Sequence, residues 1–146
     1  MTIPFDKNII LNFFSYLSTD AHNLIEDVVT DDFTLHNPFD TKHSMIEMFE
    51  AFLLLKHYIH YSFTHVNDEN HNTYEAHGNL QILDAEEDIS IRIPMSATFS
   101  IRNSLILSIV LSTTASRSEK EILLRIRRKA LKDAVVLLNK KISTAV

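Results

Sequence analysis

Glycine and cysteine are the residues that this sequence most clearly lacks. Its 146 residues include one glycine and no cysteine. Rossmann and P-loop phosphate sites need several glycines close together, so the chain cannot supply such a site. The absence of cysteine excludes disulfides, thiolate catalysis and Cys-ligated zinc or iron–sulfur centres. It also fits a reducing compartment.

Long apolar runs are missing as well. No stretch approaches the roughly 20 residues of a membrane span. Asp6 and Lys7 are not part of a basic-then-apolar leader, so we expect no signal peptide. The chain is 45% hydrophobic and 23% charged, as is typical of a globular protein of one domain. We therefore expect a cytoplasmic protein with no membrane partner.

The charges are divided unevenly along the chain. Residues 1–116 carry 5 basic and 16 acidic side chains, whereas residues 117–146 carry 9 basic and 3 acidic ones. The net charges are therefore −11 and +6, which together give the −5 of the whole chain. We accordingly predict a main domain over residues 1–116 and a basic helix over residues 117–146, packed on the same domain.

Four segments in the middle of the chain alternate between apolar and polar residues: Tyr58–Val66, Asn72–Leu83, Ile89–Ile101 and Leu105–Thr113. A period of two is typical of strands in a sheet that has one buried and one exposed face. The polar segments between them, beginning with Asp68–Asn70, are expected to be turns. The pattern predicts one strongly curved sheet whose apolar face is covered by helices.

Three helices are predicted before this sheet. Apolar residues at helical spacing predict the first two over Phe5–Leu17 and Ala21–Val29. The third begins at Thr41 or Ser44, and Ser44 and Glu47 match the spacing of a capping box.

A fourth helix, amphipathic and basic, is predicted over Arg117–Ile142. Its apolar side consists of Leu123, Ile126, Ala130, Ala134, Leu137 and Leu138. This helix has three possible roles: packing on the acidic body, pairing with the same helix of a second chain, or binding nucleic acid or anionic lipid. Its basic side has no aromatic residue to stack on bases, so we expect no nucleic-acid partner.

The segment between the second and third predicted helices carries a family resemblance. Residues 29–39 combine the acids Asp31 and Asp32, a short extended piece at Phe33–His36, and Asn37 before a proline. With the order of helices and strands, this segment resembles the NTF2-like superfamily of ketosteroid isomerases, SnoaL-type polyketide cyclases and nuclear transport factor 2. The resemblance covers roughly residues 5–115. It implies an α+β cone with N-terminal helices packed on a curved antiparallel sheet.

The residues of the isomerase reaction are not present at the matching positions. The family's general base is the Asp before the proline, and this position is Asn37, whose amide is not basic. The family's oxyanion-hole Tyr and Asp fall at Phe13 and near Ala97. We therefore expect no ketosteroid isomerase activity of the family type. Tyr16, one turn from Phe13, could substitute only from a different angle.

The apolar side of the predicted sheet defines an expected ligand pocket. If the odd-numbered residues of the first strand face inward, Tyr61 and His65 join Asn37 among its few polar groups. These three are the predicted catalytic residues, with His65 as the base and the other two donating to a carbonyl oxygen. The other predicted ligand-binding residues are Phe13, Tyr16, Leu17, His36, Phe63, Tyr74, Met95, Ala97 and Phe99.

The resemblance implies a SnoaL-like protein that binds a small hydrophobic molecule, polyketide- or steroid-like, and acts as an isomerase or cyclase if it is an enzyme. The alternative is a non-catalytic interaction or dimerisation module whose core is filled by these side chains. The eight histidines form no HExxH pattern, and we expect neither a metal nor a cofactor. Many cone-fold relatives dimerise through the polar face of the sheet, so we expect a homodimer. His60 and His77 are predicted to be cross-strand neighbours on that face.

Overall fold

The structure, a computed structural model, describes residues 7–18, 22–37, 42–70 and 72–144. Its elements in chain order are α1 (Lys7–Ser18), α2 (His22–Glu26), β1 (Val29–His36), β2 (Lys42–Ser44), α3 (Met45–Leu55), β3 (Ile59–Asn70), β4 (Thr73–Asp84), β5 (Ile89–Arg102), β6 (Leu105–Thr113) and α4 (Arg117–Thr144). The predicted order of three helices, four long strands and a final helix is confirmed.

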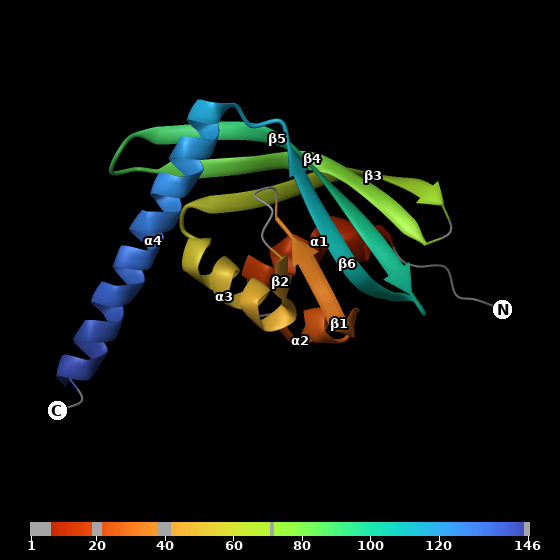
Figure 1. The fold of residues 1–146 in the computed structure, drawn as a ribbon, viewed down its shortest axis with the longest axis horizontal. Coiled ribbons are helices and arrows are strands. Elements are labelled where there is room, and N and C mark those ends of the chain that lie inside the picture. The colour runs from red at the N-terminus through yellow and green to blue at the C-terminus, as the bar shows by residue number, and fades with distance from the viewer. Residues whose placement is uncertain (1–6, 19–21, 38–41, 71, 145–146) are drawn as a thin grey trace.

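The described strands form one sheet in the order β2-β1-β6-β5-β4-β3. β1 runs parallel to β6, and the other neighbouring strands are antiparallel. The sheet curves around α1, α2 and α3, which lie on its concave side, while α4 crosses one end (Figure 1). This arrangement is the predicted α+β cone.

The core lies where the alternation of the strands places it. The buried residues of β4 and β5 are Ala76, Leu80, Ile82, Asp84, Ile93, Met95, Ala97, Phe99 and Ile101. Ile10 and Phe13 of α1, both 0% exposed, pack in the same core. Each buried side chain of this size contributes about 2 kcal/mol to folding through the hydrophobic effect. The helices on the concave side therefore cover the apolar face of the sheet.

β3 is longer than its prediction and changes facing along its length. It continues through Asn70, so the turn predicted at Asp68–Asn70 is wrong. Its pairing with β4 shifts between Phe63 and His65, where β3 has one extra residue, which makes a β-bulge. A shift of one residue exchanges the two faces of a strand. Phe63 is consequently buried and His65 is exposed.

The bulge also changes which histidines are neighbours. His65 pairs with His77, and their ring centroids are 6.2 Å apart. His60 pairs instead with Gln81, so the predicted His60–His77 pair is wrong.

The single glycine lies opposite this bulge. Gly78 pairs with Phe63, and a Cβ atom at Gly78 would lie 1.9 Å from the carbonyl oxygen of Ser62. The same atom would lie 2.7 Å from the Cα of Phe63. Glycine is required here because the two backbones approach too closely for any side chain.

The shorter elements around α3 were predicted in part. The capping box is confirmed: the Ser44 hydroxyl accepts from the Glu47 backbone N–H at 3.3 Å, and the Ser44 N–H donates to the Glu47 carboxylate at 3.2 Å. Thr41, the other predicted start, lies outside the described residues. β2 was not predicted, and α2 ends at Glu26 because Val29 already belongs to β1.

α4 packs on the body with its first half. Its buried side chains, among those described, are Leu123, Ile126 and Ala130, each at most 6% exposed. Leu137 and Leu138, predicted on the same packed side, are 59% and 58% exposed. Figure 1 shows the cause: the helix continues past the end of the body. Among the described residues, no helix is both long and apolar enough to cross a membrane.

Candidate ligand cavity

A cavity of about 440 Å³ lies between α3, the concave face of the sheet and the first half of α4. This volume is in the range of small-molecule sites. Its apolar lining from the strands consists of Leu35, Ile59, Leu80, Met95 and Leu111. The helices add Ala51, Phe52, Leu54, Leu55, Leu123, Leu124 and Leu131. The cavity therefore suits a molecule with a mainly apolar surface.

Tyr61 of β3 places a hydroxyl group in this apolar lining. Its ring stacks on Phe14 at a centroid distance of 5.0 Å and lies 5.1 Å from the ring of Phe52. Burial raises the pKa of the Tyr61 hydroxyl to about 12, so the group stays protonated at neutral pH. No described residue hydrogen-bonds this hydroxyl. It can therefore donate to an oxygen atom of a ligand.

Asn37 and His43 form a second polar group at the cavity. The antiparallel pairing of β1 with β2 sets His43 opposite Leu35, near the end of β1 where Asn37 follows. The Asn37 amide nitrogen lies 3.2 Å from Nε2 of His43. With the amide nitrogen as donor, Nε2 is the acceptor in the tautomer that carries its proton on Nδ1. In that tautomer, Nδ1 of His43 is a hydrogen-bond donor.

Charged side chains lie in the lining on the helices. Glu47 and Glu50 come from α3, and Arg127 comes from α4. Hydrogen bonds from the Ser44 backbone and side chain hold the pKa of the Glu47 carboxyl below its usual value, because they favour the charged form. Glu47 thus serves the helix cap. Among the described residues, no three His, Asp or Glu side chains group together as a metal site would require.

The part of the cone beneath α1 is filled by aromatic rings. Phe13 contacts Phe14, Phe33 and Phe99 at centroid distances of 5.4, 6.2 and 6.0 Å. Phe13, Phe63, Ala97 and Phe99, all predicted to bind a ligand, are core residues at most 7% exposed. The open volume is at α3 instead. The lining includes Met95, Asn37 and Tyr61 from the predicted sites.

The other predicted site residues do not line this cavity. His65 is exposed, which corrects the expectation that it faces inward beside Tyr61. His36 pairs with Val110, which is 44% exposed, on the face of β1 opposite to the cavity. Tyr16 and Tyr74 are partly buried against the core. The side chain of Leu17 lies outside what the structure describes.

Several lining residues escaped the sequence reasoning. His43 belongs to a strand of three residues, too short to show a period. Its one signal was its position six residues after Asn37, because an Asn-Pro pair in a sequence favours a turn. Leu124, Arg127 and Leu131 were not among the residues assigned to the apolar side of α4, and the amphipathic pattern does not reveal that α4 crosses a cavity.

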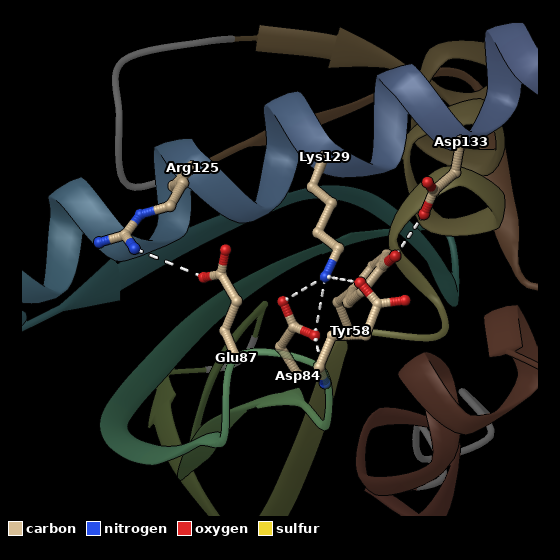
Figure 2. Close-up of polar contacts among 7 residues, drawn as sticks. Tyr58, Asp84, Glu87, Arg125, Lys129 and Asp133 are labelled. Carbon is tan, nitrogen blue, oxygen red and sulfur yellow. Dashed lines mark hydrogen bonds and ion pairs between the residues drawn. The ribbon is translucent and has the colours of Figure 1, made fainter.

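An ion-pair cluster holds α4, which forms one wall of the cavity, against the turn after β4. Lys129 of α4 donates to both carboxylate oxygens of Asp84, at 2.9 and 2.8 Å, and lies 2.8 Å from the Glu86 carboxylate (Figure 2). Asp84 is 3% exposed. The hydrogen bonds from Lys129 hold the pKa of the Asp84 carboxyl below its usual value, although burial opposes this shift. Lys129 thereby keeps a buried carboxylate charged.

Two contacts flank this cluster along α4. Arg125 lies 3.4 Å from the Glu87 carboxylate, and the Tyr58 hydroxyl donates to Asp133 (Figure 2). The basic side of α4 thus meets the acidic turn between β4 and β5. These contacts support the interpretation that the helix packs on the acidic body, while the domain boundary at residue 116 stays a prediction.

The protein has the NTF2-like α+β cone fold. Its sheet curves around α1, and its cavity lies beside α3. Solved structures that share this fold at low sequence identity include the following three. A candidate SnoaL-like polyketide cyclase from Shewanella denitrificans OS-217 has a TM-score of 0.63 and 14% identity, with 84% of this chain and 98% of that chain covered. A ketosteroid isomerase-like protein from Catenulispora acidiphila DSM 44928, in complex with trimethylamine, has a TM-score of 0.62 and 12% identity, with 76% and 87% covered.

The third is an NTF2-like protein of unknown function from Cytophaga hutchinsonii ATCC 33406. Its TM-score is 0.57 and its identity 14%, with 73% of this chain and 93% of that chain covered. Neither a protein-family model nor a curated protein sequence matches the chain. At such identities the similarity shows the fold alone, because this fold hosts many functions.

Proposed function

We propose that the protein binds a small hydrophobic molecule in the cavity between α3, α4 and the sheet. The observation that carries this proposal is the protonated Tyr61 hydroxyl inside an apolar cavity of about 440 Å³. A polyketide- or steroid-like molecule, with fused apolar rings and few oxygens, fits such a lining. The candidate SnoaL-like polyketide cyclase among the structural neighbours supports this class of ligand.

The polar groups favour a ligand that carries a carbonyl oxygen. The Tyr61 hydroxyl is a donor, and so is Nδ1 of His43 in the tautomer whose Nε2 accepts from Asn37. Two donors on a carbonyl oxygen stabilise the negative charge that develops there on isomerisation or cyclisation. We propose this role for Tyr61 and His43, with Asn37 as a positioning residue. His43 thus takes the place of His65 as the histidine of the site.

Replacing either of two alanines by tryptophan tests the site. Ala51→Trp places an indole ring in this cavity, whereas Ala134→Trp places one in a separate hollow of about 550 Å³ between α3, α4 and the turn after β4. Both alanines are helical and half-buried. Binding of a steroid or aromatic polyketide is measured by its displacement of a bound anilinonaphthalene sulfonate dye.

We expect Ala51→Trp to weaken binding at least about tenfold, equivalent to ~1.4 kcal/mol, and Ala134→Trp to leave it within about twofold. Equal binding by Ala51→Trp and the parent protein would contradict the proposal. So would the absence of displacement by every member of the panel.

The filled region beneath α1 favours a second candidate function. The rings of Phe13, Phe33 and Phe99 occupy that part of the cone, as expected of a non-catalytic interaction module. An interaction module would take up no ligand and would bind its partner through another surface. The displacement experiment therefore distinguishes the two candidate functions.

A further inference from the structure

From Leu131 onward, α4 presents an apolar stripe to solvent. Leu131, Val135 and Leu138 are 49%, 55% and 58% exposed. Their spacing of i, i+4 and i+7 sets them on one face of the helix. Arg128 and Lys132 lie beside this stripe and are exposed. A partner for it must therefore be apolar and acidic.

The exposed side of α3, which borders the cavity at Glu50, has these properties. Ile46 and Leu53 are 65% and 47% exposed, and Glu50 lies between them and is also exposed. Their spacing is again i, i+4 and i+7, so this stripe matches the one on α4 in length and period. It carries the opposite charge.

Within one chain, these two stripes do not cover each other. Each side chain concerned is about half exposed or more. α4 also runs past the end of α3 and away from the body (Figure 1). The stripe on α4 is thus left open for another molecule.

We propose that a second copy of this chain covers it, with the α4 stripe of each protomer packed on the α3 stripe of the other. A twofold axis makes both contacts at once, so the exposed apolar residues of both helices are covered in a closed dimer. The net charges of −11 for residues 1–116 and +6 for residues 117–146 favour this crossed contact over α4 against α4, which would bring two basic helices together.

This interface differs from one formed by the convex face of the sheet. That face carries polar, exposed side chains such as Ser62, Thr64 and Arg92. The helices instead offer the apolar anchors that dominate interface energetics. Leu131 also lines the cavity, so the docked partner would cover its mouth.

The mass in solution tests the proposal, measured by size exclusion with light scattering across a concentration series. We expect wild type at twice the 16.8 kDa of the chain. Val135→Glu, which changes a half-exposed residue, should raise the dimer dissociation constant at least about 30-fold. Glu50→Lys, on the other helix, should weaken the dimer similarly. The matched control Arg92→Glu, on the sheet face, should leave the dimer intact.

Circular dichroism and thermal melting establish that each variant is folded. Three outcomes would overturn the proposal: a monomeric wild type, a dimer that persists in both helix variants, or a dimer broken by Arg92→Glu alone. A monomeric wild type that binds phosphatidylserine vesicles through Val135 would instead identify the stripe as a membrane-binding surface.

Discussion

At the scale of single residues, Gly78 decides how closely two strands approach. The backbone φ of Gly78 is not positive, so its requirement is space and not a left-handed conformation. Gly78→Ala should therefore force β3 and β4 apart at the bulge and lower the free energy of unfolding by ~3 kcal/mol. Urea unfolding measures this loss. Asn79→Ala, one residue along, should cost less than about 0.5 kcal/mol, and equal losses would contradict the steric explanation.

Tyr61 and Tyr58 allow a comparison of two hydroxyl groups. Tyr61→Phe removes a hydroxyl without a described partner, so stability should change by less than about 0.5 kcal/mol while ligand affinity falls about 5–10-fold. Tyr58→Phe removes the donor to Asp133 and should lower stability without affecting ligand affinity. Thermal melts with and without the ligand measure both effects. Unchanged ligand affinity in Tyr61→Phe, with reduced affinity in Tyr58→Phe, would contradict the assignment of Tyr61 to the site.

The sequence predicted Tyr61 and Asn37 at the cavity but placed His65 there wrongly. Alternation alone sets Tyr61 and His65 on one face, and the bulge after Phe63 reverses this. The bulge depends on Gly78, which is distant in sequence, so a pattern within β3 cannot reveal it. Gly78 in an otherwise regular strand was the available signal.

At the scale of elements, the contact of Lys129 with Asp84 fastens α4 to the body. Lys129→Met leaves a carboxylate that is 3% exposed without its counter-charge. We expect faster hydrogen exchange along α4 and a melting temperature lower by several degrees. Arg125→Gln removes an exposed pair and should cost less than about 1 kcal/mol. Unchanged exchange in Lys129→Met would show that apolar packing alone holds the helix.

The long elements were predictable because each has a period. Leu123, Ile126 and Ala130 were placed on the packed side of α4 from spacing alone, and the Ser44–Glu47 cap was also predicted correctly. β2 was missed because three residues show no alternation. The exposure of Leu137 and Leu138 was missed because helical spacing does not show where the body ends.

At the scale of the whole molecule, the Asp84 carboxyl links stability to pH. Its pKa is lowered on folding from the ordinary value of 3.8, chiefly by hydrogen bonds from Lys129. The resulting stabilisation is present above that value and is lost as the pH falls through the lower, folded pKa. Asp84→Asn lacks this titration, so its stability should fall less steeply below pH 3.8. Urea unfolding across this range measures the slopes, and equal slopes would contradict the assignment.

The sequence predicted the fold as a whole better than the site. The periodicity of apolar residues and the order of the elements predict a cone. The position of the cavity within the cone depends on which aromatic side chains pack together. Phe13, Phe33 and Phe99 fill the region expected to hold the ligand, and the cavity lies beneath α3 and α4 instead. Such packing depends on distant parts of the chain, which local patterns do not encode.

The most direct test of the central claim is native mass spectrometry of the purified protein after incubation with a panel of steroids and aromatic polyketides. We predict a retained small molecule that is lost on denaturation, and reduced retention in Tyr61→Phe. A protein that retains nothing, either from its host or from the panel, would contradict the proposal that the cavity is a binding site.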